Sequence, residues 1–268
     1  MTTKNIIDQL DYFYEANDLA FDEEKHEYKL GGVTCAGISS VADYRPMPFL
    51  KFWAAKQVVE FLKDKQGAIA KCTPAEYEAL LVEAKNQHAK RTKDALSIGE
   101  RVHEWTDNHQ RGTDLPITDD IRHPVEQYLE FEKKHNVQWL AGEKMVCSKT
   151  HLVAGRTDDI AIVNGKLSVI DKKTSNRIAE SYFLQTAGYM MALLEMGIPI
   201  EQRIILRLPK TTDDKFQAAL VTTPYENDIE AFLHLRYARE WDNYVSCKFK
   251  EKIKVGKYVE ERLIIQEL

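Results

Sequence analysis

The spacing of apolar residues divides the chain into a helical first part and a strand-rich second part. Up to about residue 135, apolar positions recur every three or four residues, as on the buried face of an amphipathic helix. A short hairpin is the exception, expected over residues 21–35, where Gly31 and Gly32 separate two apolar segments. Helices are predicted over residues 49–63, from Pro74 onward with a break near 97–99, and over 121–136.

From about residue 137 the pattern changes to the alternation of strands, with turns at Gly142, Gly155 and Asn164-Gly165. The order of the elements predicts one α+β (mixed α/β) domain over residues 1–268, with a central mixed β-sheet flanked by helices. Residues 1–135 would form a mainly helical N-terminal elaboration, and residues 137–268 the sheet core. Its later elements are expected to be a helix over 179–196, strands over 202–209 and 216–224, and a helix over 226–245.

The composition agrees with a single domain that has a substantial core. Of the 268 residues, 44% are hydrophobic and 29% are charged, and no apolar run approaches the ~18 residues that a membrane helix needs. The net charge of −5 argues against a protein that coats nucleic acid, but a local basic groove remains compatible with it. The four cysteines include no CxxC pair, so we expect neither disulfides nor a zinc or iron–sulfur site, and a cytoplasmic location.

The most informative segment is HLVAGRTDDIAIVNGKLSVIDKKT, which begins at His151. Asn-Gly between two alternating apolar segments is a strong hairpin signal. Such a hairpin brings an acidic residue near its start to the same end of a sheet as Asp171 and Lys173. Residues two apart in a strand face the same side, so Asp171 can bind a metal ion while Lys173 points at the same phosphate. This combination predicts metal-dependent phosphodiester hydrolysis.

Further candidate ligands surround the hairpin. Asp158 and Asp159 compete for the first carboxylate position, and because neighbours in a strand face opposite sides, only one of them shares the face of Asp171. Glu143, on a segment expected to pair with the hairpin, is a candidate third carboxylate, acting directly or through water. His103, on a predicted helix, is a candidate imidazole ligand that would shift the preference toward Mn²⁺.

Gln185 and Tyr189 are four residues apart in the predicted helix over 179–196, so they lie on one helical face. A polar stripe beside the hairpin can bind the DNA backbone or base edges. The alternative is a solvated helix face with a tyrosine at its edge.

Taken in order, these residues resemble the PD-(D/E)xK nuclease superfamily, in particular its RecB-like exonuclease branch. The pattern of that family is a helical Gly-x-x-x-His, a Glu, a Gly-x-x-Asp, an apolar strand ending in Asp-x-Lys, and a helical Gln-x-x-x-Tyr. Its Gly-x-x-Asp spacing favours Asp158 over Asp159. The chain matches the pattern over about residues 97–190, at Gly99 to His103, Glu143, Gly155 to Asp158, Asp171 to Lys173 and Gln185 to Tyr189.

A looser resemblance lies upstream, in HEYKLGGVTCAGISSVADY and FLKFWAAK. These segments are similar to a lead-in found in certain phage members and in the mitochondrial genome maintenance exonuclease. The resemblance implies substrate-side or packing roles for Ser40 and Trp53. Relatives with an iron–sulfur cluster have four cysteines including a close pair, which this chain lacks, so no cluster is expected.

The resemblance implies a sheet of the restriction-endonuclease-like type and a set of roles at its edge. One or two Mg²⁺ or Mn²⁺ ions would be held by Asp158, Asp171, His103 and the backbone carbonyl of Lys172. Lys173 would position the attacking water or stabilise the transition state, with Glu143 in support. The residues implied to hold DNA near the metal or to contact its phosphates are Gln185, Tyr189, Arg156, Arg177 and the side chain of Lys172.

The function that follows is a DNA exonuclease acting on a free end, on a single strand or an end-containing duplex, in phage or cellular replication, recombination or repair. It would work in the cytoplasm, the host's if a phage encodes it, with recombination or replication proteins as candidate partners and no membrane association. The alternatives are a structure-specific or restriction-type endonuclease on the same core, and a non-catalytic DNA-binding module. Asp158, Asp171 and Lys173 argue against the last, which has no need of them.

Overall fold

The structure is a computed structural model, and it describes residues 3–113, 115–212, 216–221 and 226–254. Two sequence predictions reach beyond these ranges. The strand predicted over 216–224 lies outside the described residues from 222 onward, and so does the part of the predicted domain beyond residue 254.

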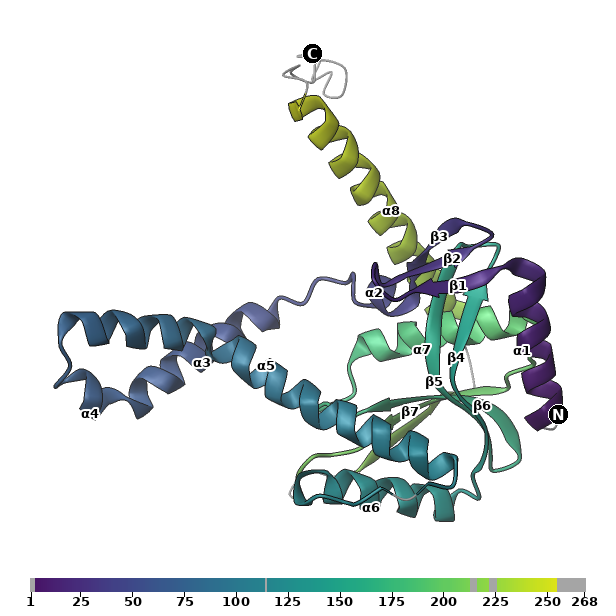
Figure 1. The fold of residues 1–268 in the computed structure, drawn as a ribbon, viewed down its shortest axis with the longest axis horizontal. Coiled ribbons are helices and arrows are strands. Elements are labelled where there is room, and N and C mark those ends of the chain that lie inside the picture. The colour runs from purple at the N-terminus through teal and green to yellow at the C-terminus, as the bar shows by residue number, and fades with distance from the viewer. Residues whose placement is uncertain (1–2, 114, 213–215, 222–225, 255–268) are drawn as a thin grey trace.

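The predicted mixed α+β architecture is confirmed, because an eight-stranded mixed sheet is flanked by helices (Figure 1). The helices are α1 (Thr3–Asn17), α2 (Ile38–Ala42), α3 (Phe49–Asp64), α4 (Gln66–Ile69), α5 (Pro74–Gln110), α6 (Asp119–Lys134), α7 (Glu180–Glu195) and α8 (Glu226–Lys254). The strands are β1 (Leu19–Asp22), β2 (Glu27–Leu30), β3 (Val33–Gly37), β4 (Gln138–Ser148), β5 (Val153–Val163), β6 (Lys166–Lys173), β7 (Gln202–Arg207) and β8 (Gln217–Val221).

The strand β5 organises the sheet. It pairs antiparallel with β4 and β6 and parallel with β3, while β6 continues the sheet through parallel β7 to antiparallel β8. The turn between β5 and β6 is the predicted Asn164-Gly165, and both residues have positive φ, 51° and 82°. Two residues of positive φ give a turn whose twist matches that of the flanking strands, which explains the choice of Asn-Gly.

The N-terminal part contributes more to the sheet than the sequence indicated. The hairpin predicted over residues 21–35 is present as β2 and β3, and it is joined by β1 on its outer edge. Through β3, which pairs with Val153 and Ala154 of β5, this three-stranded unit becomes part of the central sheet. The pairing joins residues far apart in the sequence, so local patterns carry no signal for it.

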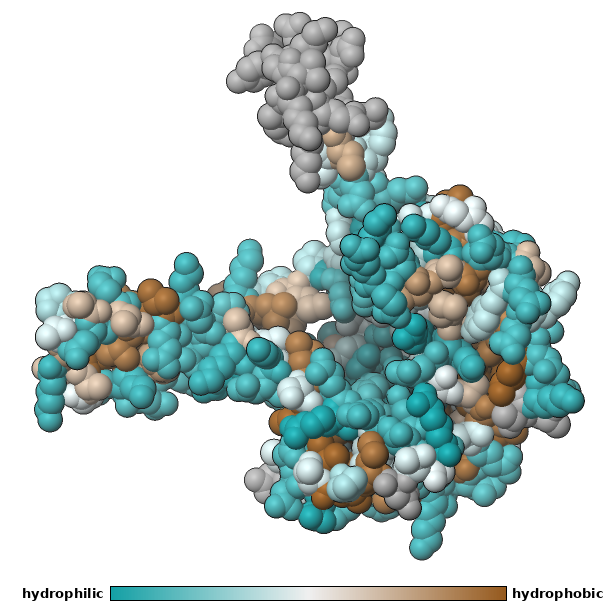
Figure 2. All heavy atoms as spheres, in the orientation of Figure 1, coloured by the Kyte–Doolittle hydropathy of each residue, from teal (hydrophilic) through white to brown (hydrophobic). Residues whose placement is uncertain are grey.

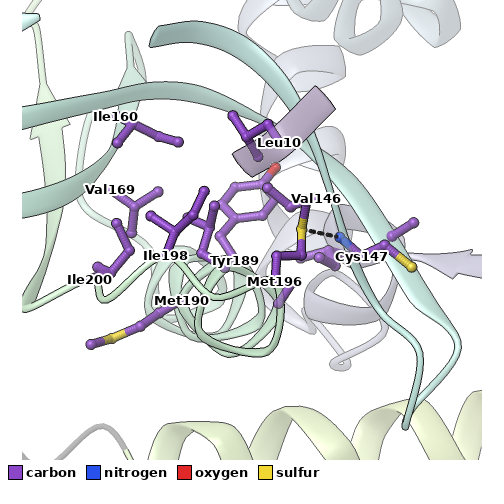
Figure 3. Close-up of a cluster of buried hydrophobic side chains, with 14 of the residues drawn as sticks. Leu10, Val146, Cys147, Ile160, Val169, Tyr189, Met190, Met196, Ile198 and Ile200 are labelled. Atoms are coloured by element: carbon purple, nitrogen blue, oxygen red, sulfur yellow. Dashed lines mark hydrogen bonds between the residues drawn. The ribbon is translucent and has the colours of Figure 1, made fainter. Parts of the chain in front are cut away.

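Helices cover both faces of the sheet and enclose two hydrophobic cores. The α7 core is formed by one face with α1, α2, α7 and part of α8, and Figure 3 shows part of it around Tyr189. The α6 core is formed by the other face with α6 and the second half of α5. Neighbouring residues of β5 alternate between them: Ile160 belongs to the α7 core and Ala161 to the α6 core. Because both faces are buried, a register slip of one residue would exchange them, so the register is strongly specified.

The break predicted near residues 97–99 is wrong, because α5 runs without interruption from Pro74 to Gln110. A single glycine inside a helix costs only about 1 kcal/mol relative to alanine, so Gly99 does not have to end it. A Cβ on Gly99 would lie 2.9 Å from Oγ1 of Thr174, which follows β6. The glycine therefore lets α5 approach the end of β6 closely.

Two helical segments extend away from the body of the molecule (Figure 1). One is the helical arm, which consists of α3, α4 and the first half of α5; the other is the end of α8. Figure 2 shows a hollow with a mainly hydrophilic surface between the arm and the body. Within the described residues, no helix is both long and apolar enough to cross a membrane.

The close packing of α7 can be tested at Gly188, where a Cβ would lie 2.9 Å from Cγ2 of Ile38 and 3.0 Å from the ring of Phe232. We expect Gly188→Ala to lower the free energy of unfolding by about 1–3 kcal/mol through overpacking. Gly67→Ala in α4, with no atom within 4 Å of the new Cβ, should instead raise it by up to about 1 kcal/mol. Urea unfolding compares the two variants, and effects of the same sign would contradict this packing.

Candidate active site

The structure places Asp158, and not Asp159, beside Asp171. Asp159 pairs with Ile170 in the antiparallel register of β5 and β6, so Asp158 and Asp171 occupy the next opposed positions and share a face. Oδ2 of Asp158 also accepts a hydrogen bond of 2.6 Å from the backbone N–H of Lys172. The two carboxylates therefore meet on the α7 side of the sheet, near the end of β6.

Asp171 is fully buried and pairs with Lys173. The ammonium Nζ of Lys173 lies 3.0 Å from Oδ1 and 2.9 Å from Oδ2 of Asp171. Burial raises the pKa of Asp171 to about 7, because Lys173 opposes the effect of burial only partly and Asp158 adds a neighbouring negative charge. Among the described residues, the buried Oδ2 has no hydrogen bond besides its ion pair with Lys173. This carboxylate lacks the full set of partners that a buried charge requires.

Lys173 connects this pair to the surrounding space. Its side chain is 21% exposed, and its ammonium lies 5.0 Å from the centre of the Tyr182 ring. Burial by itself would lower the pKa of Lys173, but the carboxylates of Asp171 and Asp158 outweigh burial and raise it. Lys173 therefore keeps its positive charge beside the two carboxylates.

His103 reaches the same cluster from α5. Its Nδ1 lies 3.9 Å from Oδ2 of Asp158, too far for a hydrogen bond, and 33% of the side chain is exposed. The helix brings it there through the close approach of Gly99, one turn earlier, to Thr174. The Gly-x-x-x-His spacing thus has a physical basis, because the glycine sets how close the histidine comes to the sheet.

Glu143 on β4 lies opposite Asp158. Gly142 pairs with Asp159 and Lys144 with Thr157, so Glu143 and Asp158 are the opposed residues between these pairs. The side chain of Glu143 is exposed, and its φ of 49° is in the left-handed region. A non-glycine residue in that conformation costs about 1–2 kcal/mol. Backbone strain of this kind is concentrated at functional sites.

Gln185 and Tyr189 form a hydrogen-bonded group with a residue of α2. Nε2 of Gln185 donates to the hydroxyl of Tyr189 at 2.8 Å and to Oγ of Ser39 at 3.2 Å. The ring of Tyr189 is buried in the α7 core (Figure 3), and burial followed by the charges of Asp171 and Asp158 raises its pKa. A Cβ on Gly155 would lie 2.9 Å from this ring. The glycine of Gly-x-x-Asp therefore makes room for Tyr189.

Ser39 was missed in the sequence, where Ser40 was chosen instead. Ser40 is exposed and, together with Ser39, lines a cavity of about 610 Å³ between β2, β3, α2 and α8. Because Ser39 and Ser40 are adjacent residues of the same type, the local sequence gave no reason to choose one over the other. The contact of Ser39 with Gln185 depends on the packing of α2 against α7, and a role for Ser40 on the substrate side stays a prediction.

The side chain of Lys172 does not contact phosphate, and this prediction is corrected. It is fully buried on the α6 side, where Nζ lies 2.9 Å from Oδ1 of Asp107 and 3.0 Å from Oδ2 of Asp159. Asp159 also accepts a hydrogen bond of 2.8 Å from Gln110, and burial raises its pKa. Asp159 is therefore the counter-charge of a buried lysine and not an alternative to Asp158.

A cavity of about 530 Å³ opens from the cluster toward the base of the helical arm. His103 and Lys173 line it from the body, and Trp53 lines it from α3. Trp53, selected in the sequence on a loose resemblance, is therefore next to the catalytic candidates in space. The cavity also has cationic walls that sequence reasoning missed, at Arg91 of α5 and Lys210 after β7.

Arg156 and Arg177 do not line this cavity, and both are exposed. The guanidinium of Arg156 stacks on the ring of Phe21 at 5.4 Å, and that of Arg177 stacks on Phe49 at 5.2 Å. Arg177 also lies 3.9 Å from Glu180. Contacts of these two arginines with DNA phosphates stay predictions.

The donor set at the cluster fits a hard divalent cation. Two carboxylates converge, one of them buried and paired with Lys173. Mg²⁺ needs only one or two protein carboxylates because it keeps several waters. No three His, Cys, Asp or Glu side chains of the described residues lie close enough to hold a metal by themselves. Ligation by His103 and by the carbonyl of Lys172 stays a prediction.

Comparisons with known proteins add a weak similarity of fold. No known family and no curated protein matches the sequence. Among solved structures, an alkaline exonuclease (LHK-Exo) from Laribacter hongkongensis has 11% sequence identity and a TM-score of 0.35, over 80% of this chain and 94% of that one. The same exonuclease in complex with dAMP has 11% identity and a TM-score of 0.33 over the same shares. At these scores the similarity is too weak to assign a role to any residue.

The structural role of Lys172 can be tested without an activity assay. We expect Lys172→Met to lower the free energy of unfolding by about 3–5 kcal/mol, because it leaves the buried carboxylate of Asp159 without its cation. Adding Asp159→Asn should recover part of the loss. Lys166→Met, at the exposed start of the same strand, should change stability by less than about 0.5 kcal/mol. Urea unfolding that finds Lys172→Met as stable as Lys166→Met would disprove this role.

Proposed function

We propose that this chain is a Mg²⁺- or Mn²⁺-dependent deoxyribonuclease that hydrolyses phosphodiester bonds from a DNA end. The observation that supports this most is the buried carboxylate of Asp171, held 2.9 Å from the ammonium of Lys173 and beside Asp158, at a cavity. A desolvated carboxylate with a raised pKa in such a position is typical of functional sites. A module that only binds DNA would have no use for this arrangement.

Each member of the cluster has a distinct role in the proposal. Asp158 and Asp171 hold the cation, with His103 as the candidate imidazole ligand and Glu143 in support. When bound, the cation neutralises charge on the scissile phosphate and lowers the pKa of water. Lys173 directs a fixed positive charge toward the same phosphate, where negative charge increases in the transition state.

The substrate side of the proposal involves α7 and the cavity. Gln185 and Tyr189, fixed by Ser39, hold the strand near the carboxylates. Trp53 offers an aromatic surface on which a base of an unpaired strand can stack. The choice of an exonuclease rather than an endonuclease rests on the resemblance of the sequence motifs to the RecB-like branch. The expected substrates are a single strand or an end-containing duplex formed in replication, recombination or repair.

The test is cleavage of linear single- and double-stranded oligonucleotides, each labelled at either end, and of covalently closed circles, with Mg²⁺ and with Mn²⁺. We expect loss of linear DNA only, and a fall in kcat of at least about 100-fold for Asp171→Asn and for Lys173→Met. Lys166→Met is the matched control on the same strand and should cleave like the wild type.

Two results would contradict the proposal in different ways. Nicking of closed circles would show an endonuclease on the same core. Binding of DNA without cleavage of any substrate by the wild type would remove the catalytic assignment altogether.

A further inference from the structure

We propose that Lys210 binds a backbone phosphate of the DNA strand next to the one that is cut. Lys210 would then be a positioning residue, because it acts on the strand and not on the reacting atoms. The inference rests on the proposed nuclease function and extends it to a residue outside the motifs discussed so far.

The sheet brings Lys210 to the same cavity as the catalytic candidates. β7 runs parallel to β6, and Lys173 pairs with Arg207. Just beyond this pair, the N–H of Leu208 donates a hydrogen bond of 2.8 Å to the carbonyl oxygen of Lys173. Lys210 follows two residues later and lines the 530 Å³ cavity together with Lys173.

Within the part of the chain that the structure describes, Lys210 differs from Lys173 and Arg91 in having no carboxylate partner. Among the described residues, no carboxylate pairs with Lys210; its ammonium donates only to the carbonyl oxygen of Ala95, at 3.2 Å. Two other cations that line the cavity each have a carboxylate partner: Lys173 has Asp171, and Arg91 has Glu60 at 3.7 Å.

The hydrogen bond to Ala95, the contact of Lys210 seen among the described residues, stabilises the position of its ammonium only weakly. Ala95 lies inside α5, where a helical carbonyl already accepts a backbone hydrogen bond. Lys210 is half-buried, and burial lowers its pKa, so the surroundings disfavour its charge. An ammonium held in this way at a cavity wall is stabilised by an anion that enters the cavity.

A phosphate of a nucleic-acid strand is the anion that the cavity suits. Its walls combine the cations Lys173 and Lys210 with the aromatic rings of Trp53 and Tyr182. Among the described residues that line it, Glu100 alone is acidic. Cations along the backbone and aromatic rings for the bases are the usual means by which proteins hold single strands. A phosphate at Lys210 would fix which bond of the strand faces Lys173.

The test is the binding of a 3′-fluorescein-labelled oligonucleotide by fluorescence anisotropy in EDTA, where no cleavage occurs. We expect Lys210→Ala to weaken binding about tenfold, the typical effect of losing a charged hydrogen bond. The slope of log K against log [salt] should fall by about 0.7 for a single strand. The affinity of Lys210→Arg should stay within about threefold of that of the wild type. The control variant Lys166→Ala should bind with the affinity of the wild type.

The same measurement on a strand with a 5′-hydroxyl and on one with a 5′-phosphate distinguishes binding of a backbone phosphate from binding of a terminal phosphate. We expect Lys210→Ala to weaken the binding of both strands equally. An effect confined to the phosphorylated strand, or an unchanged salt slope in Lys210→Ala, would overturn the proposal. If the wild type cleaves DNA but Lys210→Ala binds normally, only this inference fails. If the wild type never cleaves but Lys210→Ala still binds weakly, the phosphate site stands and the nuclease function fails.

Discussion

The burial of Asp171 is the constraint on which the candidate site depends. A carboxylate at this depth requires a positive charge, and the strand supplies it two residues later in Lys173. Lys173 compensates for this burial only in part: burial first, and then the neighbouring carboxylate of Asp158, raise the pKa of Asp171. A protein that needed only a stable sheet would place an apolar residue here. The proposed divalent cation would complete this balance.

The alternation of strand side chains gives the adjacent lysine the opposite role. Lys172 points to the α6 face, where it is fully buried between Asp107 and Asp159 and holds α5 against the sheet. Three consecutive residues therefore have different roles. Asp171 is a buried carboxylate of the candidate site, Lys172 is a structural cation, and Lys173 is a cation of the candidate site. The same α5 carries His103 to the edge of the cluster, so stability and site geometry depend on the same contact between helix and sheet.

The sequence predicted those features that follow from local pattern. The mixed fold, the hairpin turn at Asn164-Gly165 and the shared face of Asp171 and Lys173 all arise from strand periodicity and turn chemistry. The choice of Asp158 over Asp159 came instead from the Gly-x-x-Asp spacing of the family that the sequence resembles, and the structure places Asp158 opposite Asp171. Gly99 shows the limit of such reasoning: it suggested a helix break, whereas the glycine is needed for the approach of α5 to Thr174. The features that depend on long-range packing gave no local signal: the pairing of β3 with β5, the contact of Ser39 with Gln185, and the position of Lys210.

Binding of Mn²⁺ to the protein without DNA tests the central claim most directly, because it depends on the carboxylates of Asp158 and Asp171 and needs no substrate. Isothermal titration calorimetry on the wild type should show a Mn²⁺ site, and the melting temperature should rise with Mn²⁺ as mass action requires. In Asp171→Asn, with the fold verified by circular dichroism, both effects should be lost. Equal Mn²⁺ binding by the wild type and Asp171→Asn would contradict the account.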